Sequence, residues 1–156
     1  MGRRRSTGQT REVAFPPDDL TVIIDELPDR CLNPNSGAHR RTKEPYVKLL
    51  RDAASMATHQ QLLKLQDLGL LGRWVWGGPI HLDIQIWWSS DRKILDWTNA
   101  HASLKAAEDG IFDNLEANDR QVDTVRLRQN KLPRGEDGFL IYTIIAITRE
   151  DDDAKP

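Results

Sequence analysis

The residues that could do chemistry in this sequence gather in one stretch, residues 94–121. Acidic and amide side chains stand near both of its ends, with a lysine between them: Asp96, Asn99, Lys105, Asn118 and Asp119. Carboxylates joined by a helical hairpin can converge on Mg²⁺, which is usually held by one or two carboxylates plus substrate phosphate. A lysine beside them would stabilise negative charge on a scissile phosphate. The stretch therefore favours metal-dependent cleavage of a phosphodiester.

Helical spacing orders the side chains in the middle of this stretch. Over residues 99–109 we expect a short helix that ends at Gly110, because glycine is common just past the last turn of a helix. Residues three or four apart share a helix face. The polar row is Thr98, His101, Lys105 and Asp109, and the apolar row is Leu104, Ala107 and Ile111. The polar row would face a cleft; the alternative is that Lys105 and Asp109 form an ordinary surface ion pair.

The order of these residues resembles the RusA-type Holliday-junction resolvases of bacteria and their phages. That family carries D-x-D-N, then a helix with K-x-x-x-D, then D-D-x-Q before a strand. The corresponding segments here are Asp96-Trp97-Thr98-Asn99, Lys105-Ala106-Ala107-Glu108-Asp109 and Asn118-Asp119-Arg120-Gln121. Two positions depart from the family pattern, because Thr98 and Asn118 stand where the family has aspartates.

The resemblance implies a crossover junction endodeoxyribonuclease of DNA recombination and repair that uses Mg²⁺, for which Mn²⁺ can substitute. It assigns metal binding mainly to the aspartates. We therefore expect Asp96, Lys105 and Asp119 to be catalytic, and Asp96, Asp119, Thr98 and Asp109 to form the metal set with Asn99 and Asn118 in support. Neutral oxygens are weaker ligands than carboxylates, so the two departures leave an alternative: a branched-DNA-binding protein of the same fold with weakened or lost cleavage.

Basic residues elsewhere in the chain are candidates for holding a phosphate backbone. They are Arg40, Arg41, Lys43, Arg120, Arg126 and Arg128. The first three precede a long helical pattern, and Arg126 and Arg128 share one face of an expected strand. The alternative for all six is an ordinary solvated surface.

The elements that must position these residues follow from periodicity. Strands are expected over residues 20–27, 80–88, 122–129 and 139–148, and a long helix over 44–68. Residues 80–88 alternate cleanly between apolar and polar, whereas 139–148 is apolar on both faces and should be a central or helix-covered strand. The order predicts a single compact α+β domain over 19–148, with two main helices packed on a mostly antiparallel or mixed sheet. The resemblance implies that this domain is RusA-like. Residues 1–18 and 149–156 should be disordered.

Composition limits the remaining possibilities. The 156 residues carry a net charge of −2, which neither indicates nor excludes DNA binding. A single cysteine, Cys31, fits a reducing compartment. No apolar run is long enough to span a bilayer, so we expect no membrane partner and a cytoplasmic protein. The resemblance implies that the cell is bacterial or phage-infected. The resemblance further implies a homodimer that binds four-way junctions. A third possibility is an α+β module unrelated to nucleic acid whose motif match is accidental.

Overall fold

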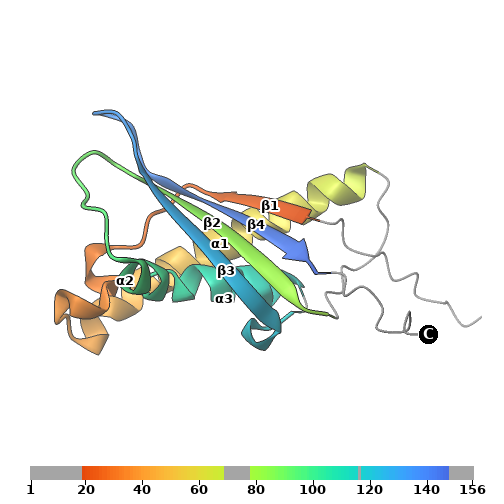
Figure 1. Cartoon of the computed structure of the whole chain (residues 1–156), viewed down its shortest axis with the longest axis horizontal. Coiled ribbons are helices and arrows are strands. Elements are labelled where there is room, and N and C mark those ends of the chain that lie inside the picture. The colour runs from red at the N-terminus through yellow and green to blue at the C-terminus, as the bar shows by residue number, and fades with distance from the viewer. Residues whose placement is uncertain (1–18, 69–77, 116, 148–156) are drawn as a thin grey trace, which may run out of the picture.

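Four strands in a single mixed sheet form the frame of the protein in the computed structural model, which describes residues 19–68, 78–115 and 117–147. The strands are β1 (Asp19–Ile24), β2 (Ile80–Trp88), β3 (Val122–Lys131) and β4 (Phe139–Ala146), arranged in the order β1-β4-β2-β3. β4 pairs antiparallel with both β1 and β2, and β3 pairs parallel to β2 (Figure 1). The predicted α+β class with a mixed sheet is confirmed, and the apolar 139–148 segment supplies a central strand.

Helices fill the connections. α1 (Arg40–Asp67) follows β1 after two short 3-10 turns, η1 (Arg30–Leu32) and η2 (Pro34–Ser36). α2 (Trp97–Ala102), α3 (Lys105–Leu115) and the 3-10 turn η3 (Asp119–Gln121) lie between β2 and β3. Two parallel neighbouring strands cannot be joined by a tight turn and need a crossover connection. Residues 94–121, which contain the candidate catalytic residues, lie within this crossover between β2 and β3.

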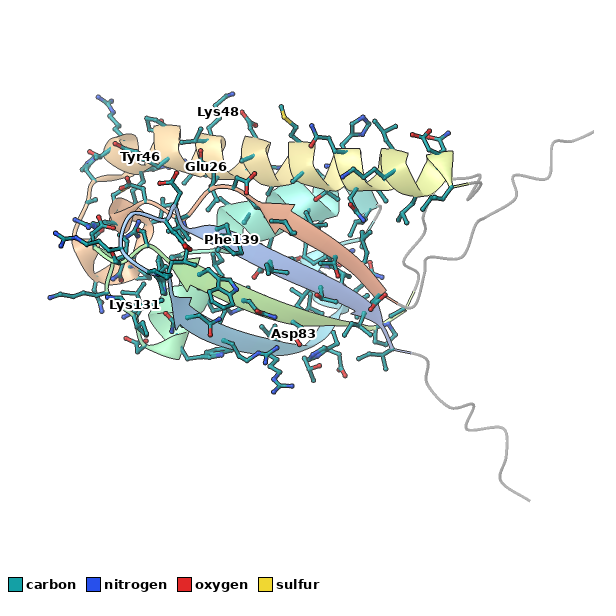
Figure 2. The ribbon with its side chains drawn as sticks, turned by 90° about the horizontal axis from the view of Figure 1, so that it is seen from above. Glu26, Tyr46, Lys48, Asp83, Lys131 and Phe139 are labelled. Atoms are coloured by element: carbon teal, nitrogen blue, oxygen red, sulfur yellow. The ribbon has the colours of Figure 1, made fainter. Side chains whose placement is uncertain are left out.

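The core lies between the sheet and the two long helices. β2 shows strict alternation, with Ile80, Leu82, Ile84, Ile86 and Trp88 buried and the residues between them half-buried. The buried faces of β1 and β4 continue this layer, and α1 and α3 pack against it and against each other. The opposite face of the sheet, which includes Asp83 and Phe139, is not covered by a helix of the described residues (Figure 2).

The expected 99–109 helix is wrong. α2 ends at Ala102, Ser103 and Leu104 form a turn, and α3 runs from Lys105 through Gly110 to Leu115. Gly110 does not end a helix; it is the point at which α3 meets α1. A Cβ atom built on Gly110 would lie 2.3 Å from the backbone oxygen of Arg51, so the absence of a side chain is required by close helix packing.

Two further boundaries differ from the expected ones by three residues or more. The first strand ends at Ile24 rather than at residue 27, and Leu27 instead packs against the core from the following loop. The long helix begins at Arg40 rather than at residue 44, with the His39 side chain accepting the Arg41 backbone N–H as an N-cap. The expected disorder of residues 1–18 and 149–156 concerns segments outside the described residues. Within those that are described, no helix is long and apolar enough to cross a membrane.

Candidate active site

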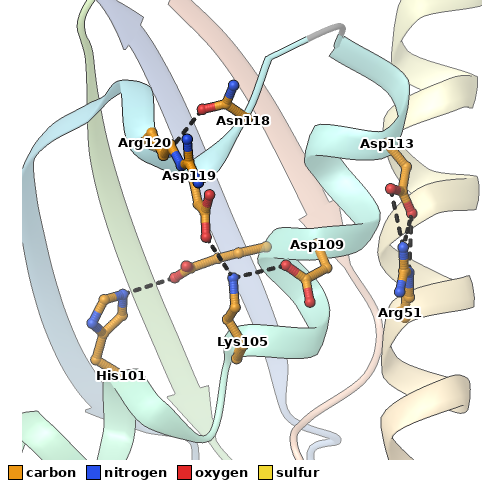
Figure 3. A network of polar contacts seen from close by, with 9 residues as sticks. Arg51, His101, Lys105, Asp109, Asp113, Asn118, Asp119 and Arg120 are labelled. Atoms are coloured by element: carbon orange, nitrogen blue, oxygen red, sulfur yellow. Dashed lines mark hydrogen bonds and ion pairs between the residues drawn. The ribbon is translucent and has the colours of Figure 1, made fainter.

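Lys105 is the centre of the candidate site. Its Nζ lies 2.9 Å from Asp109 Oδ1, one turn further along α3, and 3.0 Å from Asp119 Oδ2 in η3 (Figure 3). The pair with Asp109 has the i,i+4 spacing of an ordinary surface ion pair. Asp119 comes from a different element, 14 residues further along the chain, and makes the arrangement more than a helix surface pair. The fold thus brings three of the predicted site residues together.

The electrostatics of this cluster follow from its charges. Hydrogen bonds to Asp109 and Asp119 raise the pKa of Lys105 above its usual value, and the hydrogen bond and charge of Lys105 lower the pKa of Asp119. The cluster therefore places one ammonium group between two carboxyl groups. All three side chains are open to solvent, with 56%, 36% and 58% of the side chains of Lys105, Asp109 and Asp119 exposed. A phosphate or a hydrated cation can reach them.

Asn118 holds Asp119 in place. Its side-chain Oδ1 accepts the backbone N–H of Arg120 at 2.9 Å, and its own backbone N–H donates to Gln121 Oε1 at 3.0 Å. Asn118 and Gln121 form a capping box, since the Asn118 side chain also accepts the backbone N–H of Gln121. Gln121 also donates to the Gly78 carbonyl at 3.1 Å, which ties η3 to the start of β2. The amide of Asn118 therefore positions the turn that presents Asp119.

Asp96 has a structural contact for each of its carboxylate oxygens. As the N-cap of α2, it accepts the Asn99 backbone N–H at 2.9 Å through Oδ1 and the Asn99 side-chain amide at 2.6 Å through Oδ2. Thr98 lies exposed in the first turn of the same helix. Across residues 19–68, 78–115 and 117–147, no group of three or more His, Cys, Asp or Glu side chains is arranged to hold a metal. Asp96 thus does not join Asp109 and Asp119 in such a group.

The pair formed by His101 and Glu108 was not predicted from the sequence. His101 Nε2 lies 2.9 Å from Glu108 Oε1, and this hydrogen bond raises the pKa of His101. Glu108 is buried and contributes, after burial itself, to a raised pKa of the fully buried Tyr142. The signal in the sequence was a carboxylate next to the apolar row of α3, between Ala107 and Ile111. A charged residue at a core-facing position is costly unless it is paired.

The basic residues fall into separate regions. Arg120 follows Asp119 directly in η3, and Arg40, Arg41 and Lys43 lie in the first turns of α1. Arg126 and Arg128 alternate with the inward-facing Val125 and Leu127, so they lie on the sheet face opposite the helices. There, Arg128 Nη2 lies 3.9 Å from Asp83 Oδ1. The two strand arginines are thus on the opposite side of the sheet from α3, which carries Lys105.

Comparison with known proteins does not assign a family. No protein-family model matches this sequence, and no curated protein is significantly similar to it. The functional argument therefore rests on the residues and geometry of the site.

Proposed function

We propose that this protein is a metal-dependent, structure-selective endodeoxyribonuclease that resolves four-way DNA junctions by paired symmetric nicks. The observation that supports this best is the exposed Lys105 ammonium held between Asp109 and Asp119, which arrive from two different elements. A cation next to two carboxylates on an open surface has the composition of a phosphodiester-cleaving site. The resemblance of the surrounding motif to RusA-type resolvases supplies the substrate class.

In this proposal Asp109 and Asp119 would hold a Mg²⁺ ion, because both carboxylates are exposed and converge on the same Lys105 ammonium, and Mg²⁺ is commonly held by one or two carboxylates together with water and substrate phosphate. A bound Mg²⁺ supplies a water of lowered pKa and a polarised phosphate. Asp96 stays in the proposed metal set although it does not form a group of three with Asp109 and Asp119 in the described residues; each of its carboxylate oxygens has a second lone pair beyond the one engaged by Asn99. Thr98 and Asn99 then support this part of the site.

Lys105 acts on the substrate phosphate. Its raised pKa keeps it protonated at neutral pH, and an ammonium next to a reacting phosphate stabilises the negative charge that develops there. Asn118 is a positioning residue, because its amide orients η3 and, through it, Asp119.

Basic residues hold the DNA arms in this proposal. Arg120 lies next to Asp119 and contacts the phosphates closest to the cut, while Arg40, Arg41 and Lys43 hold an arm at the start of α1. Arg126 and Arg128 offer a second contact on the opposite face of the sheet. Binding through several phosphates weakens steeply with salt, because counterions are released. We propose a homodimer, since a four-way junction is close to two-fold symmetric and two copies can nick opposing strands.

A second candidate function is junction binding with weak or no cleavage. It is favoured by Thr98 and Asn118, which present neutral oxygens at positions where the resembling family has aspartates. The amide oxygen of Asn118 already accepts the Arg120 N–H. Both candidates predict salt-sensitive binding to a junction, and only the first predicts a metal-dependent product.

Cleavage of a labelled synthetic four-way junction in Mg²⁺, and then in Mn²⁺, separates the two candidates. Wild type is compared with Asp119→Asn at equal DNA occupancy. Asp113→Asn is the matched control, because Asp113 is an exposed carboxylate of α3 that pairs with Arg51 instead of Lys105. Paired nicks that are lost in Asp119→Asn and kept in Asp113→Asn support the nuclease. Tight binding without nicks in either metal overturns it in favour of the binding protein, and equal affinity for a linear duplex overturns both.

A further inference from the structure

A cavity of about 330 Å³ opens beside the start of α2. Its walls come from the loop after β1, from the end of β2 and from the segment that leads into α2; Figure 1 shows the loop after β1 next to α2. The residues that decide its chemistry are Pro28, Arg30, Trp88, Arg92, Lys93 and Leu95. Leu95 directly precedes Asp96, so the cavity adjoins the candidate site along the chain.

Arg92 is the central feature of this cavity. Its guanidinium lies 5.0 Å from the centre of the buried Trp88 ring and donates one hydrogen bond, 2.8 Å long, to the Pro28 carbonyl. Burial lowers the pKa of Arg92. No carboxylate in the described part of the chain lies within ion-pair distance of this guanidinium. A half-buried arginine without a carboxylate, fixed in orientation over an indole, has N–H donors available for an anion.

The two acidic residues of the cavity, Asp29 and Asp91, act on Arg92 through their charges but direct their hydrogen bonds and their ion pair to other groups. Asp29 accepts the backbone N–H of Cys31 at 2.9 Å. Asp91 accepts the Ser89 hydroxyl at 2.8 Å and pairs with Arg30 at 3.3 Å. Lys93 is exposed and makes no ion pair with any described residue. Two cations, Arg92 and Lys93, therefore line a partly apolar cavity and have no ion-pair partner among the described residues.

The volume of the cavity and the residues that line it indicate the class of ligand. Binding cavities for small molecules range from about 300 to 1,000 Å³, so a cavity at the low end has room for one nucleotide. Arginine and lysine donors suit a phosphate, and the apolar walls from Pro28 and Leu95 suit a nucleobase. We propose that the cavity binds a single unpaired nucleotide of the DNA strand next to the cleaved phosphate, with its phosphate on Arg92 and Lys93. This inference rests on the proposed nuclease function.

The test is an NMR titration of the full chain that follows the tryptophan indole N–H signals. Trp88 lies beneath Arg92 and donates its Nε1–H to Gln129 at 2.8 Å, so its signal reports on the cavity and can be assigned with Trp88→Phe. The probes are thymidine monophosphate, thymidine, inorganic phosphate and a short single-stranded oligonucleotide. We expect the monophosphate and the oligonucleotide to shift the Trp88 signal saturably, and thymidine or phosphate alone to bind more weakly.

Three variants locate the binding. Arg92→Gln and Lys93→Gln should each weaken monophosphate binding by about tenfold, the loss expected for one hydrogen bond to a charged group. Lys64→Gln, at the far end of α1, should leave it unchanged. Lys93→Gln remains informative even if Arg92→Gln impairs folding, because Lys93 is exposed. Equal affinity in wild type and Lys93→Gln overturns the proposal.

The remaining outcomes separate this inference from the nuclease proposal. Junction cleavage without any shift of the Trp88 signal would overturn the nucleotide site and leave the nuclease intact. Monophosphate binding that is lost in Lys93→Gln, in a protein that neither binds nor cuts junctions, would support the nucleotide site and overturn the nuclease. A response to free monophosphate but not to the oligonucleotide would overturn the DNA strand as the source of the ligand.

Discussion

Replacing Gly110 with alanine tests whether α3 is placed against α1 as the structure shows. The added Cβ would lie 2.3 Å from the backbone oxygen of Arg51, 3.0 Å from the Ser55 nitrogen and 3.1 Å from the Ala54 Cβ. Ordinary contact for a Cβ begins at 3.4 Å, so the helices must separate by about 1 Å. Backbone atoms cannot move aside as a flexible side chain can, and overpacking of this kind typically costs about 1–3 kcal/mol.

Helix propensity opposes this cost. Alanine in the interior of a helix is about 0.5–1 kcal/mol more favourable than glycine, so on balance we expect Gly110→Ala to lower the free energy of unfolding by about 1–2 kcal/mol. The same separation would stretch the bidentate Arg51–Asp113 ion pair and the 2.8 Å hydrogen bond from Asn114 to Ser55, which cross the same interface.

Urea unfolding followed by circular dichroism measures this change. Gly78→Ala is the matched control, because its Cβ would meet nothing within 4 Å and its φ is not positive; its stability should stay within about 0.5 kcal/mol of wild type. If Gly110→Ala were as stable as wild type, or more stable, helix propensity alone would explain it. The close approach of α1 and α3 at this residue would then be refuted.

Three other changes give distinct outcomes. The pKa of His101 is raised in the folded state by Glu108, so this pair should stabilise the protein fully below pH 6.5 and lose its contribution as pH rises through the folded-state pKa; urea unfolding across a pH series measures this. Gln129→Leu leaves the buried Trp88 indole N–H without its acceptor and should cost about 1–3 kcal/mol in denaturant unfolding. Asp96→Ala removes the N-cap of α2 and should lower the free energy of unfolding by about 1 kcal/mol in the same assay. Asp96→Asn should keep the cap, but in the junction assay it should lose the metal-dependent product.

Each of these three predictions has an outcome that would contradict it. The stability difference between wild type and His101→Gln should shrink from about pH 5.5 to about pH 8.5, and a constant difference would contradict the assigned pairing. Gln129→Leu should cost less in a Trp88→Phe background, where no indole donor is left unpaired; equal costs would exclude this hydrogen bond as the cause. Normal cleavage by Asp96→Asn would remove the Asp96 carboxylate from the metal set.

The candidate site shows which side-chain contacts can be predicted from residue types and their spacing. Lys105 and Asp109 could be paired from the sequence because their i,i+4 spacing fixes their distance once a helix is assumed. Asp119 could be proposed as a partner only through its place in the motif. Its contact with Lys105 depends on the path of the chain between α3 and η3, which no local periodicity encodes. The cavity around Arg92 has no sequence signal, because its walls come from three separate segments.

What the sequence alone determined was the set of four strands and the long helix α1. Alternation of apolar residues identified β2, and an apolar run identified the central strand β4, because those patterns depend on which faces are buried. The fold class followed from their order. The sequence misplaced the helix around Gly110, since glycine ends helices in isolation but here lies where two helices touch. Only the tertiary structure decided that contact, the burial of Glu108 against His101 and the separation of Arg126 and Arg128 from Lys105, because each depends on packing between distant segments.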